Sequence, residues 1–353
     1  MTSAVFDHPW LSGLFNDPEM AALLSPERQM AHMLAFEAAW SRACGAAGLF
    51  DSDKANEAAT VIASAEIDFA DIAAGMAQDG VPVPRLVKQL KTLAPPEAVH
   101  SGATSQDVVD TALALTLREA STLIDTRLAA LDTALAELEA RFGEAPLMGR
   151  TRMQAATEIT VRDRVLAWRL PLSGHRERLV ALRPQVERVQ IGGASGDRKA
   201  LGDKADAVVA AMAQELGLAS TEKAWHAMRE GVVGYASFLS LVTGTLGKIG
   251  GDVALMAQQG IGDIALSGGG GSSAMPHKQN PVAAELLVTL ARYNATQVSA
   301  MHHAMLHEQE RSGVAWTLEW MVLPQMLMTT GRALAVAQDI AGKVTRLGAA
   351  TDS

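Results

Sequence analysis

Residues 105–142, SQDVVDTALALTLREASTLIDTRLAALDTALAELEARF, form the most regular stretch of the sequence. Its large apolar residues recur at spacings of three, four or seven, and they are Leu113, Leu117, Ile124, Leu128, Leu131, Leu135, Leu138 and Phe142. These spacings place them on one face of an α-helix. Gly143 and Pro146 follow directly and end the pattern. The stretch therefore predicts one uninterrupted helix roughly 55 Å long.

Helical patterns also cover most of the chain after this stretch. We expect four further long helices, over about 157–189 with a kink at Pro171, and over about 225–260, 281–311 and 312–347. A shorter helix that ends near Gly217 follows the glycine-rich connection GGASGDRKALGDKAD. We find no alternating strand pattern of useful length and no internal repeat.

The first 97 residues break into shorter helical pieces. Prolines punctuate them at Pro82, Pro84, Pro95 and Pro96. The predicted fold class is therefore all-α, with a small N-terminal helical domain over 1–97 and a bundle of five long helices over 98–353.

Composition excludes several classes of protein. The chain has 353 residues, of which 48% are hydrophobic and 20% charged, as in a globular protein. A net charge of −9 argues against a nucleic-acid surface. The single Cys44 allows no internal disulfide, and the N-terminus MTSAVFDHPW has no signal-peptide pattern. With no 18-residue window free of polar breaks, we expect a cytoplasmic protein without membrane or nucleic-acid partners.

Three polar segments interrupt the apolar framework: HSGATSQDVVDT (100–111), MGRTRMQAATEIT (148–160) and SGGGGSSAMPHKQNP (267–281). Thr104 and Ser105 stand where the long helix begins, which is a preferred place for such residues, so a helix cap alone explains the first segment equally well. Arg150 and Arg152 of the second segment fit an ordinary charged surface.

The third segment is harder to explain as a linker. A linker needs Gly and Ser, but not the run Met-Pro-His-Lys-Gln-Asn followed at once by a helix, with Asn280 as its cap and Pro281 in its first turn. A serine acts as a nucleophile or base only where its alkoxide is stabilised, and Lys278 offers a positive charge six residues after Ser272. We therefore predict a lid that carries catalytic groups.

Together these segments resemble the conserved blocks of the fumarase/aspartase superfamily. GGSSAMPHKQNPVAAE is similar to its signature G-S-S-x-M-P-x-K-x-N followed by Glu, and the earlier segments are similar to T-S-x-D-x-x-D-T and G-R-T-x-x-Q. Within the superfamily the chain most resembles the bacterial 3-carboxy-cis,cis-muconate cycloisomerases. The resemblance implies a cofactor-free and metal-free enzyme that converts 3-carboxymuconate to 4-carboxymuconolactone in protocatechuate breakdown by the β-ketoadipate pathway.

The resemblance also assigns roles to residues. Ser272, or its neighbour Ser273, moves the proton α to a carboxylate, while Lys278 and Asn280 hold the aci-carboxylate intermediate. The remaining implied contacts with a polycarboxylate substrate are His100, Thr104, Ser105, Arg150, Thr151, Gln154 and Met275, with Arg292 and Arg229 as weaker candidates that a surface arginine explains equally well.

Two departures from the superfamily pattern stand out. The sequence ends near the close of the fifth helix, so we expect the usual C-terminal helical domain to be largely absent. Arg152 stands where the superfamily pattern T-H-x-Q has His. In the superfamily, the Glu at the position of Glu285 orients that His from another chain. We therefore expect Arg152 and Glu285 to pair across a subunit interface. An amine or hydroxide leaving group needs a general acid, whereas a lactone releases a carboxylate, which needs none.

Two other functions remain open at this point. An adenylosuccinate- or argininosuccinate-type lyase that releases fumarate shares much of SSAMPHK, and an inactive helical scaffold would keep the fold alone. If the first and second blocks are both catalytic, the long helix between them holds them too far apart for one chain to bring both to one substrate, so sites shared between the subunits of a homotetramer are expected.

Overall fold

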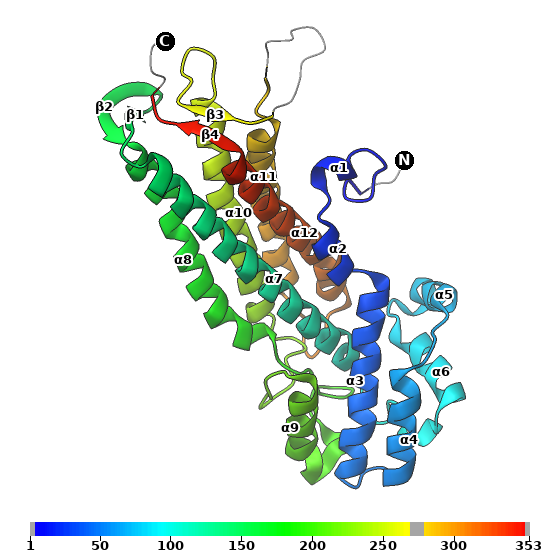
Figure 1. The fold of residues 1–353 in the computed structure, drawn as a ribbon. Coiled ribbons are helices and arrows are strands. Elements are labelled where there is room, and N and C mark those ends of the chain that lie inside the picture. Colours follow the sequence, from blue (N-terminus) through cyan, green and yellow to red (C-terminus); the bar gives the residue numbers. More distant parts are fainter. Residues whose placement is uncertain (1–3, 269–278, 350–353) are drawn as a thin grey trace.

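The computed structural model describes residues 4–268 and 279–349. Long helices dominate this part of the chain and run side by side in an elongated bundle (Figure 1). They are α7 (Ser105–Phe142), α8 (Val161–Val186), α10 (Glu230–Met256), α11 (Val282–Ala304) and α12 (Gly313–Lys343). The predicted all-α class with its long-helix bundle is confirmed.

Helix α7 has the predicted bounds. Thr104 and Asp107 form a capping box at its start, and Gly143 follows its last residue. Six of the eight predicted apolar residues are at most 2% exposed: Leu117, Ile124, Leu128, Leu131, Leu135 and Leu138. Since burying one such side chain contributes about 1.5–3 kcal/mol, this face fixes α7 in the bundle.

Short strands occur where the sequence shows no alternating pattern of useful length. Short strands are present in the described part of the chain: β1 (Pro146–Thr151), β2 (Gln154–Thr160), β3 (Ile264–Leu266) and β4 (Val344–Leu347). Strands β1 and β2 form an antiparallel hairpin, and β3 pairs with β4. The helix expected from 157 therefore begins only at Val161, and the last helix ends at Lys343 rather than near 347.

Turn chemistry explains why the sequence does not reveal the hairpin. Thr151 pairs with Gln154, which leaves Arg152 and Met153 as a two-residue turn. Both have positive φ angles, 49° and 66°, as the favoured two-residue hairpin turns require. Glycine and asparagine usually fill such positions, and neither occurs at this turn.

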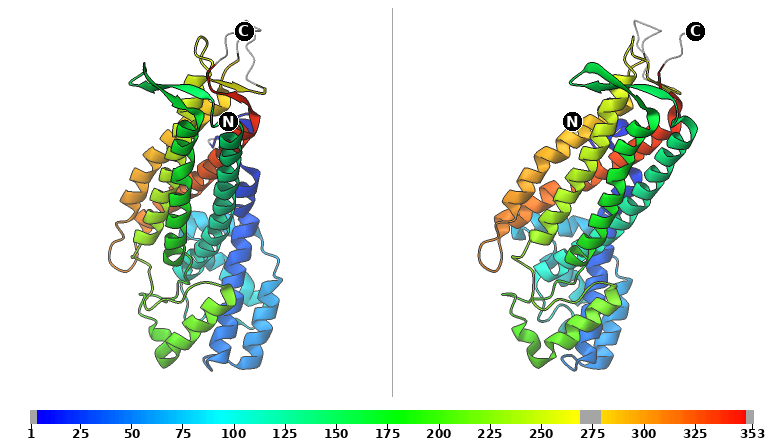
Figure 2. Two further views of the ribbon diagram at one scale, coloured as in Figure 1. Left: turned by 60° about the vertical axis from the view of Figure 1, so that its left-hand side comes forward. Right: turned by 90° about the vertical axis from the view of Figure 1, so that its left-hand side faces the viewer.

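Most of the remaining helices gather around one end of the bundle, whereas the first two, near the N-terminus, lie alongside it (Figure 1, Figure 2). The chain begins with α1 (Ser12–Phe15), α2 (Pro18–Leu23), α3 (Pro26–Ala46), α4 (Ser52–Ala63), α5 (Phe69–Asp79), α6 (Val83–Leu93) and η1 (Pro96–Ala98), and later adds η2 (Lys199–Lys204) and α9 (Ala205–Leu216). A second apolar cluster joins α3, α4 and α6 to the first turns of α7 and to α9. The domain division at 97/98 stays a prediction.

One described helix, α10, is long and apolar enough to cross a membrane by length and composition alone. Of its most apolar 18-residue window, 56% is buried inside the fold. Because α10 packs against α8, α11 and α12, its apolar residues have a place in the bundle core.

Candidate active site

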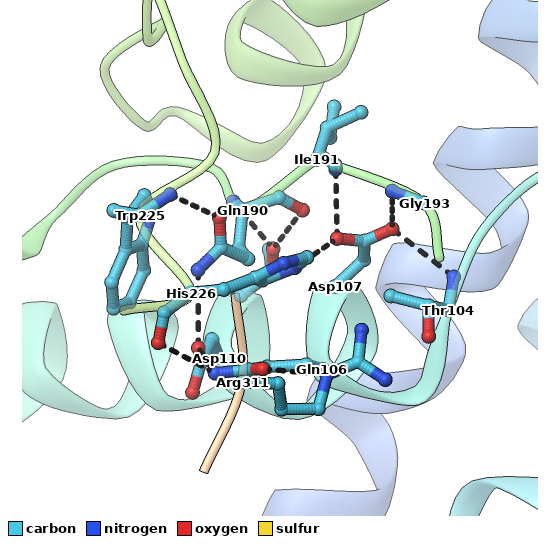
Figure 3. A network of polar contacts seen from close by, with 12 residues as sticks. Thr104, Gln106, Asp107, Asp110, Gln190, Ile191, Gly193, Trp225, His226 and Arg311 are labelled. Carbon is cyan, nitrogen blue, oxygen red and sulfur yellow. Dashed lines mark hydrogen bonds and ion pairs between the residues drawn. The ribbon is translucent and has the colours of Figure 1, made fainter. Parts of the chain in front are cut away.

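Asp107 organises the end of the long-helix bundle where α7 begins (Figure 3). Its buried carboxylate accepts hydrogen bonds from the backbone N–H groups of Thr104 at 3.1 Å, Gly192 at 2.8 Å and Gly193 at 2.9 Å. The ring of His226 donates a fourth, from Nε2 at 2.8 Å. Asp107 thus joins the first polar segment, the glycine-rich connection and the chain just before α10.

Glycine is required where the connection passes this carboxylate. A Cβ atom on Gly192 would lie 2.6 Å from Cβ of Ala224 and 2.7 Å from Cε1 of His226. Gly193 has a φ angle of +68°, a backbone conformation that other residues rarely adopt. The glycines therefore allow two N–H groups to approach Asp107.

The structure brings the predicted residues of the first segment together at this end. His100, Thr104 and Ser105 are half-buried around the start of α7. Nδ1 of His100 lies 2.6 Å from Oε1 of Glu37. Burial lowers the pKa of His100, but the Glu37 carboxylate more than offsets this, and the pKa is raised above its usual value. The segment therefore forms a helix cap and also carries a half-buried ring that favours positive charge.

Sequence reasoning missed two further polar groups here. Arg311 donates from Nε to Oε1 of Gln106 at 3.0 Å and from Nη2 to the carbonyl of Ala194 at 3.2 Å (Figure 3). The second group is the ring of His226, which hydrogen-bonds the carboxylate of Asp107. Neither lies in a polar segment that the sequence singled out, and only the fold brings them near Thr104.

Arg229 is neither a substrate ligand nor a surface arginine. Its guanidinium is fully buried, with Nη1 2.7 Å from Oδ2 of Asp110 and Nε 2.8 Å from Oε1 of Glu319. Burial lowers the pKa of Arg229. The two carboxylates raise it by a larger amount, so the net shift of the pKa is upward. The ring of Trp225 lies 4.8 Å from the guanidinium carbon. Arg229 therefore holds α7, α10 and α12 together.

The second polar segment lies at the opposite end of the bundle, on the β1–β2 hairpin (Figure 1). Arg150, Thr151, Arg152 and Gln154 are all exposed there. Of these four residues, Arg150 forms an ion pair within the described part of the chain, with Asp263 at 3.8 Å.

The end of the third segment lies at this same end. Asn280 is half-buried and lines a cavity of about 390 Å³ with Arg332 and Lys343. The expected cap is wrong by one residue, because Pro281 takes the N-cap position and no side chain caps α11. Glu285 and Arg292 are exposed on α11. Ser272, Ser273, Met275 and Lys278 lie outside the described residues.

The two groups of candidate residues thus lie at opposite ends of α7. Its 38 residues separate them by roughly 57 Å. One chain does not bring them to the same small molecule. Metal ligands do not gather either, since no group of three or more His, Cys, Asp or Glu suitable for a metal ion occurs among residues 4–268 and 279–349.

Comparison with known proteins identifies the family. A model of the lyase family matches residues 16–298. The chain belongs to this family. A 3-carboxy-cis,cis-muconate cycloisomerase of Pseudomonas putida is 39% identical over 350 residues, which are 97% of this chain and 82% of the relative. One from Pseudomonas aeruginosa is 40% identical over 330 residues, covering 90% and 71% of the two chains.

Solved structures agree with the sequence comparison. The crystal structure of 3-carboxy-cis,cis-muconate lactonizing enzyme from Pseudomonas putida matches with a TM-score of 0.90 and 38% identity. The match covers 96% of this chain and 77% of that one. Membership of the fumarase/aspartase superfamily, predicted from the three blocks, is confirmed.

Proposed function

We propose that this lyase-family enzyme interconverts 3-carboxy-cis,cis-muconate and 4-carboxymuconolactone in protocatechuate degradation. Relatives named 3-carboxy-cis,cis-muconate cycloisomerase match more than nine-tenths of the chain at 33–39% identity, and a further one matches 90% of it at 40%. The residue that carries the proposal within the chain is Arg152, which stands exposed at the hairpin turn where superfamily lyases commonly carry His.

The identity of Arg152 fits the chemistry of a lactone. Lactone opening expels a carboxylate, whose conjugate acid has a pKa of about 4, so no proton donor is needed for the leaving group. In the reverse direction, a free carboxylate attacks the diene and the adjacent carbon takes up a proton. A guanidinium stays charged throughout and orients the attacking carboxylate by bidentate hydrogen bonds.

The proton transfer is assigned to the signature loop. Ser272 or Ser273 returns the proton to the carbon α to a carboxylate. Lys278 and Asn280 stabilise the negative charge of the aci-carboxylate intermediate. The reaction is an isomerisation and calls for no cofactor in this scheme.

The active site is proposed to form between subunits. His100, Thr104 and Ser105 of one subunit meet Arg150, Thr151 and Gln154 of another when bundles pack antiparallel. A dihedral homotetramer is the simplest assembly that gives every site both groups. We place it in the cytoplasm, where a reducing environment suits the unpaired Cys44.

An ultraviolet assay tests the proposed function. The purified protein should remove the conjugated-diene absorbance of 3-carboxymuconate and form the lactone. Release of fumarate from succinyl substrates would identify a fumarate-releasing lyase instead, and inactivity on every substrate would identify a scaffold.

A further inference from the structure

We propose that Glu37 is a positioning residue of the active site, which pairs with the His100 ring and holds it in one orientation to receive a substrate carboxylate. Glu37 lies on α3, 63 residues before His100, and outside the three polar segments. The proposal rests on the proposed function for the identity of the substrate, but the pairing of the two side chains stands on geometry alone.

The burial of Glu37 is the first observation. Its side chain is fully buried, and its neighbours along α3, Phe36 and Trp40, belong to the second apolar cluster. Within the described residues, Oε1 contacts His100, while Oε2 has no hydrogen-bond partner. A buried carboxylate with one unpaired oxygen weakens a fold, so packing alone gives no reason for a glutamate at this position.

The turn that carries His100 has other anchors on the same face of α3. Oγ of Ser41 donates to the carbonyl of Ala98 at 2.7 Å, and Nε1 of Trp40 donates to the carbonyl of Ser101 at 3.2 Å. Both hold backbone atoms. Among the described residues, the Glu37 carboxylate hydrogen-bonds only the imidazole ring, so this contact acts on the orientation and charge of that ring.

Charge and geometry then define what the ring presents. With Nδ1–H donated to Glu37, Nε2–H is left as the donor at a side chain that keeps 16% of its surface exposed. His100 has a φ angle of +59°, an uncommon conformation that the surrounding contacts must maintain. Charged groups on three helices act on the pKa of the ring: Glu37 on α3 and Asp107 on α7 raise it, and Lys91 on α6 lowers it.

The decisive experiment compares Glu37→Gln with a matched control. Glutamine keeps the size and one acceptor but removes the charge, so the ring titration of His100, followed by NMR, should move down by about one pH unit or more. At a pH above the His100 pKa of both the wild type and Glu37→Gln, the variant should have a KM about ten times higher and a similar kcat. The reason is that fewer of its His100 rings are charged to bind substrate. The melting temperature should stay the same or rise, since the buried charge is gone.

Ser41→Ala is the control, because it removes an anchor of the same turn without touching the ring. It should lower the melting temperature and leave the His100 titration unchanged. An unchanged titration in Glu37→Gln, or a loss of activity that is equal at every pH and parallels a lower melting temperature, would overturn the proposal. The titration also separates the two proposals, since a wild-type protein without lactonising activity refutes the function but leaves the pairing of Glu37 with His100 measurable.

Discussion

His226 and Asp107 lie 119 residues apart in the sequence, yet Nε2 of the first is 2.8 Å from Oδ1 of the second, inside the protein. The contact is one of four that converge on a single carboxylate. The position of the first polar segment therefore depends on Asp107, which belongs to that segment and is fully buried.

Removal of this carboxylate should loosen the whole end of the bundle. In Asp107→Ala, the His226 ring and three backbone N–H groups lose their buried acceptor, which we expect to cost about 3–5 kcal/mol of unfolding free energy. Urea unfolding measures the loss. Asp339→Ala is the control, because Asp339 forms a half-exposed ion pair with Lys343, and its removal should cost less than about 1 kcal/mol. Equal losses in the two variants would show that Asp107 is not the anchor.

Loss of Arg229 should have a cost that depends on pH. In the folded protein, burial raises the pKa of Glu319. The pairing with Arg229 lowers it by more, so the net shift of the pKa is downward. The stability that the Arg229–Glu319 ion pair contributes is present at neutral pH and is lost as the pH falls through the lowered pKa of Glu319. Arg229→Met removes the guanidinium from between two buried carboxylates, which should cost about 3–5 kcal/mol at pH 7.

The same variant should recover part of this stability in acid. Without Arg229, the raising effect of burial on the pKa of Glu319 is less opposed, so its carboxyl group takes up a proton at a higher pH than in the wild type. The difference in unfolding free energy between the wild type and Arg229→Met should therefore shrink from pH 7 to pH 5. A constant difference would contradict the buried pairing.

Replacement of Arg152 tests the chemistry proposed for the hairpin turn. Arg152→His should lower kcat/KM for lactonisation by about tenfold to a hundredfold, because it removes a fixed charge and its bidentate hydrogen bonds. Steady-state kinetics should also show a higher KM for carboxymuconate. We expect Arg152 to pair with Glu285 of another subunit, so Glu285→Gln should weaken binding as well. Kinetics that match the wild type in Arg152→His would place this residue outside the site.

The signature serines should be needed for turnover but not for folding. Ser272→Ala should slow turnover by about a hundredfold or more while the melting temperature and assembly stay unchanged. Lys278→Met should reduce both binding and turnover, because it removes charge stabilisation of the intermediate. A wild-type rate in the double variant Ser272→Ala, Ser273→Ala would refute the serine base.

Sequence periodicity was sufficient for the long helices because their apolar faces are continuous. Helix α7 has the predicted bounds, since a cap and a stop signal flank an unbroken face. Helix α11 ends at Ala304, seven residues before the expected end, and the chain then turns through Gln309 with a φ angle of +51°. No glycine or proline marks that turn, so tertiary contacts decide it.

The candidate site was predictable only where its residues lie in polar segments. His100 and Thr104 stood out in such a segment, and the structure places them together. Glu37 was hidden within an apolar helix, and Arg311 follows a helix that was expected to continue to it. Their partners lie 63 and 205 positions away in the sequence, and local sequence patterns do not contain such contacts.

The central claim is that an active site combines opposite ends of two different chains, and subunit complementation tests it most directly. His100→Gln disables the first polar segment and Arg150→Ala disables the second, and each variant alone should be nearly inactive. When the two are co-expressed and purified as mixed oligomers, about a quarter of the sites should contain both intact segments and regain activity. The pair His100→Gln and Thr104→Val, both in the first segment, should regain none. An inactive mixture of His100→Gln with Arg150→Ala, in oligomers shown to contain both chains, would contradict the shared site.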